Sequence, residues 1–124
     1  MSKTRQNIGK TGEHLAETYL SSRGFVLLEK NLVTPFGEID LIAKDKDYLV
    51  FIEVRTLTSE IFGTPLESIG KIKRQHILKN CQYYMSKRHL HNKYWRIDVI
   101  GIKLDRSLSI EYLTHVKNAI VVQG

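Results

Sequence analysis

The chain has 124 residues, of which 42% are hydrophobic and 26% charged, and a formal net charge of +6. This length supports one domain with a single core, and no apolar run approaches the roughly 18 residues of a membrane span. The polar N-terminus lacks the apolar segment of a secretion signal, so we expect a cytoplasmic protein. The single cysteine, Cys81, excludes an internal disulfide and has no partner at zinc-site spacing, so we expect it to be buried in a helix.

The order of apolar patterns along the chain predicts a mixed α/β fold. Residues 1–7 are polar and basic, and we expect a mobile arm there. The elements predicted after it are a helix over residues 8–23, strands over 24–32, 37–44 and 48–56, a helix over 71–88, and strands over 94–103 and 108–113. This order, α-β-β-β-α-β-β, predicts a single domain with a central mixed sheet flanked by helices.

The strands over 37–44 and 48–56 flank a short polar segment, which predicts a tight hairpin. With the turn centred on Lys46 and Asp47, the pairs on one face are Ile39 with Val54, Leu41 with Ile52, and Ala43 with Val50. That face is wholly apolar and belongs in the core. On the opposite face, Asp40 lies opposite Glu53. Facing Cβ atoms are about 4.5–5.5 Å apart, a separation at which like charges are destabilising.

The facing carboxylates of Asp40 and Glu53 indicate a functional site. A hard divalent cation bound through oxygen atoms would compensate their repulsion. The alternative is a solvated sheet face from which both acids point into water. The apolar pair Ile42 and Phe51 lies next to them on the same face, which implies that the face is partly covered. Half-buried carboxylates need compensation, so the hairpin favours the metal site.

Further candidates lie outside the hairpin. Glu13 lies at the border of the apolar stripe of the first helix, although on spacing alone the helix dipole is the simpler explanation for an acid in a first turn. Gln75 lies at the edge of the apolar stripe of the second helix. The alternation of the strand over 94–103 places Asp98 near the acidic face.

Positive charge is concentrated in the second half of the chain. The basic residues at the start and middle of the second helix are Lys71, Lys73, Arg74 and Lys79. A protein that contacts phosphate backbones needs such a cluster. A solvated helix face explains the same cluster equally well.

Four segments resemble the YraN-like family of bacterial proteins, which is grouped with Holliday-junction-resolvase-like predicted endonucleases of the PD-(D/E)XK superfamily. These segments are Gly37 to Ala43, Val50 to Arg55, Lys73 to Gln75, and Arg96 to Val99. The resemblance extends from about Ile8 to Ile102 and implies a restriction-endonuclease-like fold.

The resemblance implies metal ligands at Asp40 and Glu53, with Glu13 as the acid from the first helix. The position two residues after Glu53 is usually lysine in this superfamily and is Arg55 here. Arginine stays protonated, so Arg55 cannot be a general base, but it can stabilise negative charge. Gln75 resembles the polar helix residue that some relatives place over the site.

These features predict an endonuclease that hydrolyses phosphodiester bonds in DNA, structured or branched DNA in particular, with Mg²⁺ or Mn²⁺ as cofactor. Arg55 would stabilise the developing charge, Gln75 would position water or phosphate, and the basic second helix would hold the DNA backbone. Resolution of a junction requires two nicks, so the resemblance also implies a homodimer.

The sequence is compatible with two other functions. The first is a catalytically inactive nucleic-acid-binding module on the same fold, which Arg55 favours. The second is an assembly or scaffold role, for which an exposed apolar surface would be the distinguishing feature.

Overall fold

A computed structural model of the chain describes residues 2–58, 64 and 66–121, with side chains from Asn7 onward. It contains one five-stranded sheet and two helices in the predicted order α-β-β-β-α-β-β. The elements are α1 (Ser2–Ser22), β1 (Val26–Thr34), β2 (Gly37–Asp45), β3 (Tyr48–Thr58), α2 (Lys71–Lys87), β4 (Tyr94–Leu104) and β5 (Ile110–Val116). The predicted fold class is confirmed, and it is consistent with a single-domain nuclease-like fold.

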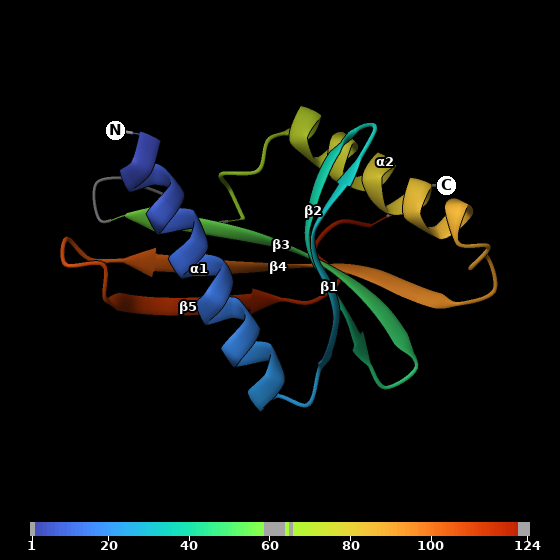
Figure 1. Ribbon diagram of the computed structural model, residues 1–124, viewed down its shortest axis with the longest axis horizontal. Helices are drawn as coiled ribbons and strands as arrows, with labels where there is room; N and C mark the ends of the chain where they lie inside the picture. The colour runs from blue at the N-terminus through green and yellow to red at the C-terminus, as the bar shows by residue number, and fades with distance from the viewer. Residues whose placement is uncertain (1, 59–63, 65, 122–124) are drawn as a thin grey trace.

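The strand order in the sheet is β1-β2-β3-β4-β5. All neighbouring strands are antiparallel except β3 and β4, which are parallel because α2 connects them as a crossover. Figure 1 shows α1 crossing one face of the sheet, with α2 on the other side of the β1–β2 hairpin. The sheet is therefore mixed, as predicted.

Two apolar cores lie on the two faces of the sheet, because alternate residues of a strand point to opposite faces. On the α1 face, Leu20 packs with Leu41 and Ile52. On the α2 face, Cys81 packs with Phe51. Only 1% of Cys81 is exposed, which confirms the expectation of a buried helix residue. No helix in the part of the chain that the structure describes is long and apolar enough to cross a membrane.

The β2–β3 hairpin has the predicted register at its closed end, from Asp45↔Tyr48 to Leu41↔Ile52. Its turn contains Lys46 in the left-handed region, with φ of 55°. The pairing of β2 with β3 ends at Leu41. The prediction that Ile39 pairs with Val54 on the same face as Leu41 is therefore wrong. Ile39 packs in the core on the α2 face instead of beside Leu41, because β2 turns toward α2 where β3 no longer holds it.

The first helix is longer than predicted. It begins at Ser2, so it includes residues that we expected to form a mobile arm. The prediction rested on the apolar stripe, which begins at Ile8. Lysine, arginine and glutamine have good helix propensity, which allows a helix to extend beyond the part that packs on the sheet.

α1 approaches β3 closely at Gly12. A Cβ atom at Gly12 would overlap Oγ1 of Thr56 on β3, so only glycine allows this approach. We expect Gly12→Ala to lower the free energy of unfolding by about 1–3 kcal/mol, because the helix or Thr56 must move. Urea unfolding followed by circular dichroism measures this change.

Gly9 provides the matched control, because a Cβ atom there would meet no atom within 4 Å. We expect Gly9→Ala to leave stability unchanged or to raise it by roughly 0.5–1 kcal/mol through better helix propensity. Equal stability of Gly12→Ala and the parent protein would show that α1 does not need this close approach.

Candidate metal centre

The two central strands of the sheet separate next to Asp40 and Glu53. β2 continues beyond Leu41 with β1, and β3 continues beyond Ile52 with β4. At the fork, the backbone N–H of Val54 donates to Oδ2 of Asp40 at 2.9 Å. The Asp40 carboxylate thus accepts the hydrogen bond that a backbone carbonyl of β2 would accept from Val54 if the strands stayed paired. The fork holds the Asp40 carboxylate in a fixed position between the strands.

The Asp40 carboxyl group lies in an environment that disfavours its charge. Burial and the neighbouring Glu53 carboxylate raise the pKa of Asp40 from 3.8 to about 7, and Glu13 and Glu38 add to the increase. The hydrogen bond from Val54 acts in the opposite direction and lowers the pKa. The effect of Glu53 on the pKa of Asp40 shows that the two acids are close, as predicted. They meet where β2 and β3 separate, and not as a facing pair of hydrogen-bonded strands.

Glu53 is more deeply buried, with 6% of the residue exposed. Burial raises its pKa, while the positive charges of Lys73 and Arg55 lower it in part. The Nζ atom of Lys73 lies 3.7 Å from Oε1 of Glu53. One lysine therefore reaches into the acidic cluster from α2, and it is itself half-exposed.

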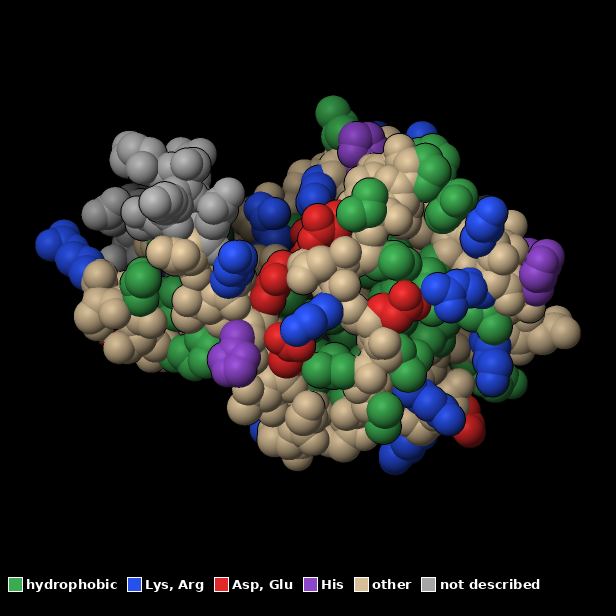
Figure 2. All heavy atoms as spheres, in the orientation of Figure 1, with side chains coloured by type: hydrophobic (Ala, Val, Ile, Leu, Met, Phe, Trp, Pro, Cys, Tyr) green, Lys and Arg blue, Asp and Glu red, His purple; other side chains and the backbone are tan. Residues whose placement is uncertain are grey.

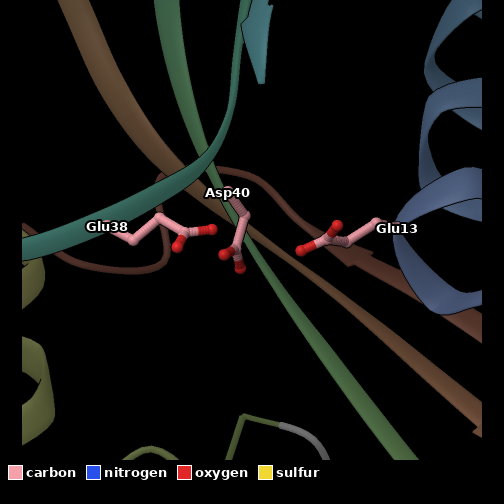
Figure 3. A group of neighbouring side chains, drawn as sticks. All are labelled: Glu13, Glu38 and Asp40. Carbon is pink, nitrogen blue, oxygen red and sulfur yellow. The ribbon is translucent and has the colours of Figure 1, made fainter. Parts of the chain in front are cut away.

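Two further acids complete the cluster. Carboxylate oxygens of Glu13, Glu38 and Asp40 lie within 4.8 Å of one another. Figure 3 shows Glu38 and Asp40 on β2 and Glu13 reaching toward them from α1. The Nδ2 group of Asn31 on β1 donates to Oε1 of Glu38 at 2.9 Å and to Oε1 of Glu13 at 3.2 Å. Glu13 therefore lies beside Asp40, and its metal-ligand role stays a prediction of the family resemblance.

A small cavity of about 10 Å³ lies beside Glu53 on the α2 face. Its polar lining comes from Glu38, Glu53 and Asn80. This volume is close to what one water molecule occupies. Asn80 is buried, accepts a hydrogen bond from the hydroxyl of Thr34, and faces Gly37. The cavity gives the cluster room for one small group.

Of two other predicted site residues, Arg55 lies near Glu53 but bonds to Ser68, and Gln75 lies elsewhere. Arg55 donates from Nε to Oγ of Ser68 at 3.0 Å and from Nη2 to the Ser68 carbonyl at 3.4 Å. Gln75 is exposed and lines a separate hollow with Lys71, Arg74 and residues 119–121. The structure therefore brings Lys73, and not Gln75, from α2 to the carboxylates.

The basic residues of α2 point in several directions. Arg74 donates from Nε to the carbonyl of Ile69 at 3.1 Å, Lys71 and Lys79 are exposed, and Lys73 contacts Glu53. Figure 2 shows acidic side chains gathered at the centre of one face, with Lys and Arg side chains around them. The acidic cluster thus opens onto a surface that carries positive charge.

Asp98 does not belong to this cluster, contrary to the prediction. It is fully buried and accepts hydrogen bonds from Arg96 at 2.9 Å and from the backbone N–H of Asn118 at 2.9 Å. Its Oδ2 also lies 2.8 Å from Nε2 of His115. In β4 Asp98 alternates with Val99, which faces α2, so Asp98 points to the α1 face.

Sequence reasoning missed four residues of the cluster: Asn31, Glu38, Asn80, and Lys73 in this role. Lys73, Ile77 and Asn80 are spaced at i, i+4 and i+7, which places them on one face of a helix. This spacing was available from the sequence. The place of Asn31 could also be predicted from the sequence, because a two-residue turn at Pro35 and Phe36 puts it opposite Asp40.

The donor set suits a hard divalent cation. It consists of carboxylate and amide oxygens, which are the ligands that Mg²⁺ and Mn²⁺ prefer. Burial raises the pKa of both Asp40 and Glu53, and repulsion from the neighbouring acids raises that of Asp40 further, so the ionised pair is costly without a cation. Two cations, Lys73 and Arg55, act on Glu53 in a cluster of four acids, so the cluster keeps the negative charge and the ligand atoms that a metal ion needs.

The fold and the site together define a small α/β protein with a carboxylate cluster where two central strands of a mixed sheet separate. The chain belongs to the family described as Uncharacterised protein family UPF0102, which matches residues 12–102. It is 44% identical over 115 residues to a UPF0102 protein of Clostridium botulinum (strain Kyoto / Type A2), covering 92% of this chain and 94% of the relative. It is 39% identical over 119 residues to a UPF0102 protein of Moorella thermoacetica (strain ATCC 39073 / JCM 9320), covering 96% and 99%. The resemblance to the YraN-like family is confirmed at this level.

Proposed function

We propose that this protein is a metal-dependent endonuclease that hydrolyses phosphodiester bonds in DNA, structured or branched DNA in particular. The observation that carries the proposal is the fork of the sheet, where Val54 holds the Asp40 carboxylate beside the buried Glu53. Two acids kept together against their repulsion are costly for folding, and a binding surface for polyanions gains nothing from them. A bound cation that takes part in a reaction on a phosphate would explain why the two acids lie together.

Asp40 and Glu53, with Glu13 from α1, would hold Mg²⁺ or Mn²⁺. When bound, such an ion polarises a phosphate oxygen and lowers the pKa of a coordinated water. Asn31 donates hydrogen bonds to Glu13 and Glu38, and the backbone N–H of Val54 holds Asp40. Lys73 and Arg55 supply positive charge beside Glu53, where it can stabilise the charge that develops on the phosphate. Exposed Lys71 and Lys79 would contact the DNA backbone.

We assign Lys73 a larger part in this chemistry than Arg55. The amine of Lys73 contacts Glu53, whereas the guanidinium of Arg55 is held by Ser68. We expect Lys73→Ala to lower the metal-dependent cleavage rate at least about tenfold, and Arg55→Ala to lower it less. Initial rates on one labelled DNA substrate, measured at saturating Mn²⁺, test this order.

Lys87→Ala is the matched control, because Lys87 lies in the last turn of the same helix and its loss removes the same charge. An equal fall in rate for Lys73→Ala and Lys87→Ala would mean that Lys73 acts only through general attraction of DNA.

The proposal is tested with labelled linear, flapped and four-way-junction DNA, each with Mg²⁺, with Mn²⁺ and with EDTA. We expect cleavage that requires the metal and is fastest on one branched substrate. Calorimetric titration with Mn²⁺ should detect a specific site without DNA. No metal binding and no cleavage of any substrate would exclude the endonuclease.

A catalytically inactive nucleic-acid-binding module is the second candidate, and one observation favours it. Arg55 stands where this superfamily usually has lysine, and its guanidinium is bonded to Ser68. Such a module would bind DNA with equal affinity in Mn²⁺ and in EDTA. The homodimer implied by the resemblance stays a prediction, which sedimentation equilibrium can test.

A further inference from the structure

Two tyrosine side chains form an exposed aromatic surface at the end of the sheet where β3 and β4 begin. Tyr48 and Tyr94 are paired in the parallel register, and their ring centroids are 5.7 Å apart with an interplanar angle of 35°. The exposed fractions are 42% for Tyr48 and 69% for Tyr94. We call this pair the tyrosine ledge. Adjacent exposed aromatic rings often mark a binding surface.

The ledge is supported from inside by charged groups that the carboxylate cluster does not use. The Arg96 guanidinium lies 5.3 Å from the centre of the Tyr48 ring. Its Nε donates to Asp98 at 2.9 Å, and its Nη2 donates to Asp45 at 2.9 Å. Because Asp98 is fully buried, Arg96 has little freedom to move. The network therefore fixes one face of the Tyr48 ring and leaves the ledge preorganised.

The surroundings of the ledge combine apolar surface with positive charge. A hollow of about 220 Å³ next to Tyr48 is lined by Leu28, Leu90, Lys44 and Lys93. Neither lysine forms an ion pair with the residues that the structure describes, although Asp47 also lines the hollow. Aromatic rings next to unpaired amines match a ligand with flat apolar faces and a negative backbone.

We propose that the tyrosine ledge binds an unpaired segment of a polynucleotide, with bases stacked on the tyrosine rings and phosphates contacting Lys44 and Lys93. Bases in a duplex already stack on each other, so only unpaired bases offer a free face. Stacking is tolerant of sequence, which suits a surface with few hydrogen-bonding groups. The role of the ledge in DNA cleavage rests on the proposed function, whereas binding to the ledge requires no metal.

The position of the ledge indicates the kind of substrate. Asp45 at the ledge and Asp40 at the fork are five residues apart in β2, which is at most roughly 17 Å of strand. This length corresponds to about five base-pair steps. A substrate that engages both sites would therefore have an unpaired segment within a few nucleotides of the cleaved bond.

The test compares a labelled oligothymidylate with an abasic oligonucleotide of the same length, using the full chain in EDTA. Both ligands carry the same phosphates, so a difference in affinity reports the bases. Because stacking on one aromatic side chain is worth roughly five- to 150-fold in affinity, we expect tighter binding of the oligothymidylate by at least about fivefold. Tyr94→Ala should remove this preference, while Tyr94→Phe should retain most of it. Equal affinities for the two ligands would overturn the inference.

Tyr112→Ala is the matched control, because Tyr112 is an exposed tyrosine on β5 with 39% exposure. We expect it to bind both ligands like the parent protein. Asp40→Asn should also keep the preference for bases even when cleavage is lost, so failure of the nuclease and failure of the ledge are distinguishable. If Tyr94→Ala instead dissociates a dimer in sedimentation equilibrium and leaves oligonucleotide affinity unchanged, the ledge is a contact between copies of this chain and the inference is wrong.

Discussion

Asp40→Asn is expected to reduce metal-dependent cleavage more than about 100-fold, because it removes a charged ligand of an ion that contributes several kcal/mol to the reaction. Glu53→Gln should have a similar effect. The Asn side chain keeps an oxygen that can accept the hydrogen bond from Val54, so the fork itself should survive. Initial cleavage rates on the best substrate, together with a Mn²⁺ titration, measure the loss.

The same substitution should not weaken the metal-free protein. Asp40 is half-buried beside Glu53, and their repulsion is removed when one of them becomes neutral. We therefore expect the thermal midpoint of Asp40→Asn in EDTA at about pH 8 to equal or exceed that of the parent protein. Saturating Mn²⁺ should raise the midpoint of the parent by about 5 °C or more and that of Asp40→Asn much less.

Glu111→Gln serves as the matched control, since Glu111 is an exposed acid on β5, away from the fork. It should cleave and bind metal like the parent protein. If Asp40→Asn and Glu53→Gln cleave normally and respond to Mn²⁺ like Glu111→Gln, the carboxylate cluster is not a metal site. The binding module then becomes the better account of this protein.

The hairpin shows how far local sequence determines this fold. Alternating apolar residues and a polar turn are local features, and they predict the register from Asp45↔Tyr48 to Leu41↔Ile52 correctly. The fork beyond Leu41 depends on a hydrogen bond between the Asp40 side chain and the Val54 backbone. This bond replaces the strand pairing only once the protein is folded. Extending the hairpin pairing by sequence alone therefore places Ile39 on the wrong face.

The second helix shows a similar limit for the site. Residues 73 and 75 are two positions apart, which is about 200° around a helix, so Lys73 and Gln75 cannot both face the carboxylates. From the sequence, the charge of Lys73 predicts a phosphate contact, whereas the position of Gln75 at the edge of the apolar stripe and the family resemblance predict a place at the pocket. The structure reverses this assignment because Lys73 shares a face with Ile77 and Asn80, which line the cavity beside Glu53. Helical phase relative to Ile77 and Asn80 decides between them.

Stability of the metal-free protein should depend on pH in the direction opposite to that given by carboxylates paired with a cation in the folded state. The pKa of Asp40 is about 7 in the folded protein against its ordinary value of 3.8, so between these values the folded state holds a proton that the unfolded state has lost. The free energy of unfolding therefore falls by an amount on the order of 2–4 kcal/mol as pH rises from about 4 to about 7. It stays at the lower value above pH 7. Glu53 acts in the same direction, because its pKa is also raised.

The comparison of urea unfolding between the parent protein and Asp40→Asn isolates this contribution. The pKa of Asp98 is lowered by His115 and Arg96 against the effect of burial, so its contribution is lost only below about pH 4, outside the window. The difference between parent and variant should grow in favour of Asp40→Asn from about pH 4 to about pH 7. Saturating Mg²⁺ should reverse it near neutral pH, because metal binding requires the deprotonated carboxylate. A constant difference across this range, with and without Mg²⁺, would show that Asp40 ionises freely, and the fork would then impose no electrostatic cost that a metal ion could relieve.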